Sequence, residues 1–195
     1  NYKDALSASG NRGVTREYPH TPGIDAVGEV IESNSSDFKT GEKIIVTGYD
    51  LGMNTFGGFG QYISISANWA IPLPKKLSEA EAMSIGTAGL TAGLCVRKLL
   101  MNDFTPDSGN VLVTGASGGV GSVAVMVLSK LGFKVVALTG KKDQADYLES
   151  LGASSVIMRS EMEEQGKPLQ RGIYQGGVDT VGGNILSNFI SQTSQ

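Results

Sequence analysis

Residues 111–132 constrain the fold of this chain more than any other stretch of its sequence. The β-forming run 111–113 enters a turn that contains four glycines, and apolar residues at helical spacing then continue to Gly132. A strand, a glycine turn and a helix in this order are typical of the phosphate-binding corner of a dinucleotide-binding sheet. Glycine lets the backbone approach a diphosphate closely, and the first amides of the helix then attract the anion.

The motif within this stretch is A-x-G-x-x-G, formed by Ala116, Gly118 and Gly121, rather than the strict G-x-G-x-x-G. The alternative interpretation is a glycine-rich turn between a strand and a helix that binds no ligand. The alternating pattern of strands and helices that follows favours the nucleotide-binding interpretation.

The pattern before residue 78 differs from the pattern after it. Glycine-rich turns separate short stretches of β-forming residues, which is typical of a partly open β-barrel. The strands expected there cover residues 24–31, 43–47 and 61–66. Ser78, followed by Glu81 three residues later, predicts a helix start, and a second helix is expected over residues 87–100.

From residue 111 onward, strands and helices alternate. The expected strands are 111–113, 134–138, 155–158 and 178–181, with a helix over roughly 142–151 between the second and the third. Right-handed crossovers turn this order into a parallel sheet with helices on both faces. We therefore expect an α/β chain with a partly open β-barrel portion in residues 1–77 and a doubly wound parallel sheet of the dinucleotide-binding kind in residues 78–195. Since a doubly wound sheet has two halves, we also expect both domains to be incomplete, as parts of a longer polypeptide.

Composition excludes several other classes of protein. The net charge of −3 offers no basic field for nucleic acid, and no apolar run approaches the roughly 20 residues of a membrane helix. The single cysteine, Cys95, rules out an internal disulfide and is consistent with the cytoplasm. One histidine and one cysteine are too few for a zinc site built from three or four such ligands, so no metal is expected.

The end of the second strand of the sheet distinguishes NAD from NADP, because a carboxylate there accepts hydrogen bonds from the ribose 2′-hydroxyl and repels a 2′-phosphate. Here the strand is followed by Thr139, Gly140 and Lys141, which suit phosphate oxygens, and Arg159 after the third strand adds a cation. These residues favour NADP(H). The alternative is a solvated lysine pair at a helix start, and the nearby Asp143 argues for NAD.

Several motifs occur in an order and spacing that resemble the zinc-free medium-chain dehydrogenase/reductases, and within them the bacterial quinone oxidoreductase-like group that includes NADPH-dependent acrylyl-CoA reductase. The motifs cover residues 1–5 (NYKDA), 22–25 (PGID), 41–42 (GE), 86–92 (GTAGLTA), 115–121 (GASGGVG) and 178–182 (VDTVG). The resemblance implies a GroES-like barrel followed by a Rossmann domain. The positions that match zinc ligands in related alcohol dehydrogenases hold Asn1, Ile24 and Thr87, so the resemblance implies hydride transfer without a metal.

The resemblance also assigns roles to individual residues. The residues that it places around the cofactor are Tyr2 and Thr91 near the nicotinamide, Ser117, Gly118, Gly119 and Val120 at the pyrophosphate, and Thr139, Gly140, Lys141 and Arg159 at the 2′-phosphate. Asn1 and Asp25 are the candidate catalytic residues at the interdomain cleft, with Asn1 donating a hydrogen bond to a substrate carbonyl. Asp25 is expected to orient Asn1 or the ribose, and its alternative role is to bond local amide groups in a turn.

The function expected from these residues and from the resemblance is NADPH-dependent reduction of an activated C=C bond in an enoyl thioester such as acrylyl-CoA. Quinone reduction is the alternative within the same family. A non-catalytic nucleotide-binding protein and an NAD-linked, metal-dependent alcohol dehydrogenase are alternatives from other classes. The expected partners are a small-molecule substrate and a second copy of the chain in a cytoplasmic homodimer, with neither nucleic acid nor membrane involved.

Overall fold

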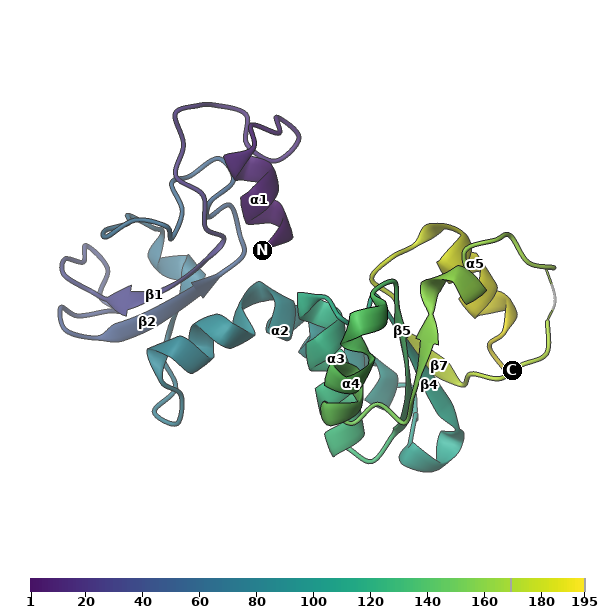
Figure 1. Ribbon diagram of the computed structural model, residues 1–195. Coiled ribbons are helices and arrows are strands. Elements are labelled where there is room, and N and C mark those ends of the chain that lie inside the picture. The colour runs from purple at the N-terminus through teal and green to yellow at the C-terminus, as the bar shows by residue number, and fades with distance from the viewer. Residues whose placement is uncertain (169, 195) are drawn as a thin grey trace. The chain divides into compact units, whose positions relative to one another are not determined.

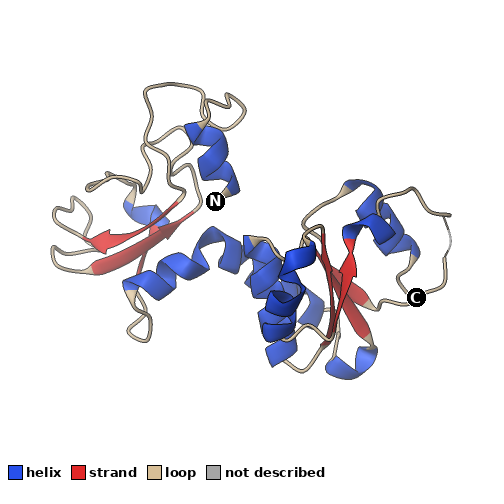
Figure 2. Ribbon diagram, in the orientation of Figure 1, coloured by secondary structure: helices blue, strands red, loops and turns tan. Residues whose placement is uncertain are grey.

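The computed structural model describes residues 1–168 and 170–194, which form two compact units, Asn1–Thr87 and Ala88–Gln195 (Figure 1). The first unit contains a short helix, a small antiparallel sheet and long irregular connections, whereas the second alternates strands with helices (Figure 2). The expected functional boundary between residues 77 and 78 stays a prediction.

The sheet of the first unit has three antiparallel strands in the order β1-β2-β3. Its strands are β1 (Asp25–Glu29), β2 (Lys43–Thr47) and β3 (Ala70–Pro72). Asp25 is paired with Thr47 in the register of β1 and β2. The predicted strand over residues 43–47 is confirmed, and the first predicted strand is shorter than expected at both ends.

The strand predicted over residues 61–66 is wrong, because these residues form an irregular segment. The third strand of the sheet is β3, which pairs with β2 instead. Alternating polar and apolar residues predict a strand only when a neighbouring backbone is in position to form the ladder. Among the described residues no backbone pairs with residues 61–66 as a strand.

The two helices expected over this stretch are present and form α2 (Glu79–Leu100), because the backbone at Gly86 is not helical and separates a first helix from a second that begins at Thr87. Its start is capped as predicted, since the amide of Glu81 donates to Ser78 Oγ and the amide of Ser78 donates to Glu81 Oε2. The kink lies at Gly86, whose φ of 47° is a left-handed conformation that favours glycine. None of the helices in the described part of the chain combines the length and apolar character needed to cross a membrane.

The second unit is built on a parallel sheet with the strand order β6-β5-β4-β7. The strands are β4 (Asn110–Thr114), β5 (Lys134–Thr139), β6 (Ser155–Met158) and β7 (Gly176–Val178). The helices that follow them are α3 (Gly119–Lys130), α4 (Ala145–Ser150) and α5 (Gly183–Ser191). The chain runs outward from β4 through β5 to β6 and then returns to the other side of β4, which creates a topological switch point between β4 and β7.

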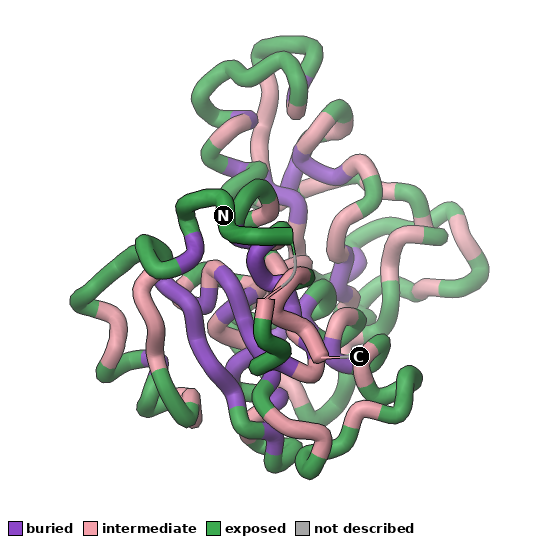
Figure 3. Tube along the Cα trace, turned by 90° about the vertical axis from the view of Figure 1, so that its right-hand side faces the viewer, coloured by how far each residue is buried: buried purple, intermediate pink, exposed green. Residues whose placement is uncertain are grey.

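Helices cover both faces of this sheet, as the crossover rule predicts (Figure 1). On one face, Val111 and Val113 of β4 pack with Ala124 and Leu128 of α3. On the other face, Leu112 of β4 packs in a separate cluster with residues of α5. Because β4 and β5 are buried on both faces, nearly all their residues are inaccessible (Figure 3).

Two helices and one strand end differ from the expectations. The fourth predicted strand, 178–181, ends early, because β7 covers Gly176–Val178 and residues 179–182 form the turn into α5. Helix α5 and helix α1 (Tyr2–Ala8) were not expected at all. Both are short, and α1 is exposed at most of its positions, so neither carries a long apolar stripe.

Candidate nucleotide-binding site

The site begins at the switch point of the parallel sheet, where ligands bind outside the carboxyl ends of the strands. Strand β4 ends at Thr114 and leads through the glycine turn into α3. Its neighbour β7 ends at Val178 and leads through residues 179–182 into α5. The first turns of two helices therefore follow directly from two adjacent strand ends.

Two positions of the turn require glycine, because neighbouring atoms lie too close for a Cβ. Gly115 has a φ of 59°, and a Cβ there would collide with Thr180 Oγ1. A Cβ on Gly121 would collide with the carbonyl oxygen of Gly115 and would lie 2.7 Å from the Cα of Ala116. Gly121 thus lets α3 pack directly on the end of β4, as the fingerprint predicts.

The first turn of α3 presents backbone amides to the outside. Gly118 is its N-cap residue and is exposed, as is Gly119. No residue in the described ranges accepts a hydrogen bond from the amides of Gly119, Val120 and Gly121. Unpaired amides at the positive end of a 12-residue helix are suited to an anion such as a diphosphate.

The turn after β7 is held by a network that the sequence analysis did not identify. Thr114 Oγ1 donates to Asp179 Oδ1 at 2.5 Å and accepts a hydrogen bond from the amide of Thr180 at 3.0 Å. The other carboxylate oxygen of Asp179 accepts from the amide of Gly182 at 2.9 Å. These bonds fix the two strand ends to each other and position the start of α5.

The second loop of the predicted site follows β5. Thr139, at the end of this strand, is only 1% exposed, and its Oγ1 lies 3.0 Å from Ser117 Oγ. The same oxygen accepts a hydrogen bond from the amide of Lys141 at 3.1 Å. The structure therefore brings Thr139 and Ser117 together. The buried Thr139 hydroxyl connects the glycine turn after β4 with the loop after β5.

Arg159 lies against the same loop from the end of β6. A Cβ placed on Gly140 would lie 3.4 Å from Nε and 3.5 Å from Cζ of Arg159, so the guanidinium covers the face of this glycine. Lys141 is exposed beside it. Arg159 Nε also pairs with Glu163 Oε1 at 2.6 Å, a contact that the sequence analysis did not identify.

Two predicted residues of the first unit, Asn1 and Tyr2, lie at the start of α1. Asn1 caps this helix, and its Oδ1 accepts a hydrogen bond from the amide of Tyr2, whose side chain is 76% exposed. The buried carboxylate of Asp4 accepts from the main-chain nitrogen of Asn1 and, at 3.0 Å, from the amide of Ile24. Asp4 thus ties the first motif of the chain to the residue that precedes Asp25.

Asp25 bonds to Thr87 rather than to Asn1 among the described residues. Its Oδ1 accepts hydrogen bonds from the amide and from the hydroxyl of Thr87. Thr91 lies one turn later on α2, at an exposed position. The roles expected for Asn1, Tyr2, Asp25 and Thr91 in one shared site stay predictions.

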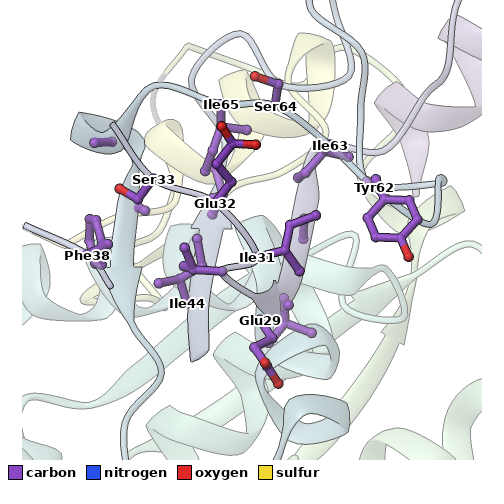
Figure 4. A pocket seen from close by; sticks show the side chains of 18 of the residues that line it. Glu29, Ile31, Glu32, Ser33, Phe38, Ile44, Tyr62, Ile63, Ser64 and Ile65 are labelled. Carbon is purple, nitrogen blue, oxygen red and sulfur yellow. The ribbon is translucent and has the colours of Figure 1, made fainter. Parts of the chain in front are cut away.

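A cavity lies elsewhere in the first unit (Figure 4). It has a volume of about 870 Å³ and lies between β1 and the irregular segment 61–65. Apolar side chains such as Ile31, Ile44 and Ile63 line it together with Glu29. None of the predicted site residues contributes to its wall, so the cavity does not enter the nucleotide site.

The first unit matches a known domain model. Residues 1–75 match the model of the alcohol dehydrogenase GroES-like domain. This match supports the barrel portion expected from the sequence, although the structure forms only a three-stranded sheet there.

The whole chain is also similar to proteins of known structure or curated name. It is 46% identical over 193 residues to acrylyl-CoA reductase AcuI of Ruegeria pomeroyi, covering 98% of this chain and 58% of AcuI. The yhdH oxidoreductase of Salmonella enterica, crystallised in complex with NADP, is 42% identical with a TM-score of 0.96 over 99% of this chain and 59% of that chain. Protein yhfP of Bacillus subtilis, crystallised with NAD bound, is 47% identical with a TM-score of 0.93 over the same shares. The chain thus spans less than two thirds of the length of these relatives.

Proposed function

Because this chain belongs to the quinone oxidoreductase-like medium-chain dehydrogenase/reductases, we propose that the protein is an NADPH-dependent reductase of an activated C=C bond in a small molecule. The proposed substrate class is an enoyl thioester resembling acrylyl-CoA. The similarity to AcuI over 98% of this chain supports this class.

The geometry of the glycine turn fits a dinucleotide. The amides at the exposed start of α3 can bind a diphosphate, and Gly115 and Gly121 let the turn pack closely against its neighbours. Gly118, Gly119 and Val120 would hold the diphosphate through their amides, with Ser117 beside them. Thr139 would act from behind Ser117, since its hydroxyl is buried against that side chain.

The observation that carries the choice of NADP(H) is the position of Arg159 over Gly140, next to the exposed Lys141. Two cations on adjacent loops suit the charge of a 2′-phosphate, and Arg159 can bind its oxygens through two N–H groups. The complex of the Salmonella relative with NADP supports this choice.

When bound, the reduced nicotinamide would supply a hydride to the β-carbon of the substrate, and water would supply the proton to the α-carbon. Charge then develops on the carbonyl oxygen of the thioester, and the side-chain amide of Asn1 is proposed to donate a hydrogen bond to it. Asp25 accepts a hydrogen bond from the amide of Thr87, and we propose that it orients the site by fixing the start of the helix there. Tyr2 and Thr91 are proposed to lie near the nicotinamide.

We also propose a homodimer in the cytoplasm, as the family resemblance implies. Cys95 is a free cysteine, which agrees with a reducing compartment. Quinone reduction is the alternative function, because it uses the same hydride and the same nucleotide residues.

The test is an NADPH-oxidation assay of the full-length protein with acryloyl-CoA and a small quinone measured side by side. We expect turnover of acryloyl-CoA with NADPH and at least tenfold slower turnover with NADH. Faster turnover of the quinone would favour the alternative function. Binding of NADPH without turnover of either acceptor would indicate a non-catalytic nucleotide-binding protein.

A further inference from the structure

The ion pair between Arg159 and Glu163 lies in the loop where the proposed 2′-phosphate would bind. The distance from Arg159 Nε to Glu163 Oε1 is 2.6 Å, and about half of each side chain is exposed. The guanidinium that covers Gly140 therefore has its Nε edge occupied by a carboxylate before any nucleotide arrives.

The main chain around Glu163 is held in place by hydrogen bonds from two asparagine side chains of α5. The carbonyl oxygen of Glu163 accepts a hydrogen bond from Asn184 Nδ2 at 3.0 Å. The carbonyls on either side, of Met162 and Glu164, accept from Nδ2 of the buried Asn188 at 3.0 and 2.7 Å. Helix α5 thus anchors residues 162–164, and the carboxylate of Glu163 is presented to Arg159 from a fixed backbone.

A carboxylate at this position has two effects on a bound phosphate. It occupies one of the guanidinium edges that a bidentate phosphate contact uses, and its charge offsets the charge of Arg159. A 2′-phosphate and the carboxylate therefore compete for the same cation, whereas a neutral 2′-hydroxyl carries no charge for which Arg159 and Glu163 would compete.

We propose that Glu163 is a specificity-determining residue that weakens binding of the 2′-phosphate by competing for Arg159. The proposal rests on the proposed nucleotide site. Glu163 thereby narrows the difference in affinity between NADPH and NADH without contacting the diphosphate or the nicotinamide.

The test measures dissociation constants of NADPH and NADH by fluorescence titration for the wild type, Glu163→Gln and the matched control Glu164→Gln. The control removes the same charge one residue away, where the carboxylate forms no ion pair with any described residue. We expect Glu163→Gln to tighten NADPH binding about three- to tenfold at low salt, with less gain at high salt. The affinity for NADH and both affinities of Glu164→Gln should stay within about twofold of the wild type.

A second measurement separates competition from a general charge effect. In an Arg159→Ala background, Glu163→Gln should no longer tighten NADPH binding, because the group for which the carboxylate competes is gone. A gain that persisted in full there, or an unchanged NADPH affinity in the single variant, would overturn the inference while leaving the proposed function intact. A wild type that did not bind NADPH would overturn both.

Discussion

The carboxylate of Asp25, at the start of β1, accepts two hydrogen bonds from Thr87, which lies 62 positions later in the sequence. The amide and the hydroxyl of Thr87 both donate to Oδ1 at 2.8 Å. Gly86, directly before Thr87, has the left-handed φ that kinks α2, and a Cβ there would lie 2.8 Å from the other carboxylate oxygen. Asp25 therefore caps the part of α2 that begins at Thr87, as an N-cap side chain does from a neighbouring position.

Replacing Asp25 with alanine should destabilise the first unit. Loss of the cap removes both hydrogen bonds from Thr87 to Asp25, so we expect the free energy of unfolding to fall by about 1–2 kcal/mol. The measurement is urea unfolding followed by circular dichroism. Asp25→Asn, which keeps an acceptor oxygen, should lose less than half as much, and equal losses in both variants would contradict the capping role.

Gly121→Ala should damage the second unit at the glycine turn. Its Cβ would collide with the carbonyl oxygen of Gly115, so α3 must move away from the end of β4. We expect a loss of about 2 kcal/mol or more in the free energy of unfolding, together with weaker NADPH binding. Gly93→Ala is the matched control, because nothing lies within 4 Å of a Cβ there and alanine is the better helix former. A Gly121→Ala variant as stable as Gly93→Ala would contradict this packing.

The elements that could be predicted from sequence are those whose buried positions produce a regular pattern of apolar residues. β6 has the predicted bounds, β5 is longer than predicted by one residue at its end, and β4 is longer by one residue at each end. Continuous apolar runs mark β4 and β5 as strands buried on both faces. The irregular segment 61–66 has the alternation of a strand, yet alternation does not supply a pairing partner. Helices α1 and α5 were missed because each is short and depends on contacts made elsewhere in its unit.

In the candidate site too, features with a local sequence motif could be predicted, whereas contacts between residues far apart in the sequence could not. The glycine turn and the cationic loop are local patterns, and in the structure Ser117 lies beside Thr139 and Arg159 beside Gly140. The inward position of the Thr139 hydroxyl was not predictable, because it depends on the register of β4 beside β5. Contacts between residues far apart in sequence, such as Asp25 with Thr87, have no local signature.

Replacing the buried Asn188 should remove the hydrogen bonds that hold the segment carrying Glu163 against α5. Its Nδ2 donates to two main-chain carbonyls, and its Oδ1 accepts a hydrogen bond from the amide of Gly166 at 2.9 Å. Asn188→Leu leaves these buried and partly buried main-chain groups without their partner, so we expect a loss of about 2–3 kcal/mol in the free energy of unfolding. Asn184→Ala, at an exposed position of the same helix, should cost less than about 1 kcal/mol. Comparable losses in both variants would show that the buried network contributes little.

Tyr174 should make the second unit sensitive to alkaline pH. Burial raises the pKa of its phenol, and the negative charge of Glu161 raises it further. Because the folded pKa lies above the unfolded value of about 10, the unfolded chain releases the proton first, and stability is lost as the pH rises from that value through the folded pKa. Tyr174→Phe keeps the edge-to-face contact with Phe189 but has no proton to lose. Urea midpoints measured between about pH 8 and pH 11 should therefore fall more steeply for the wild type than for Tyr174→Phe, whereas parallel curves would contradict the burial of the phenol in the folded state.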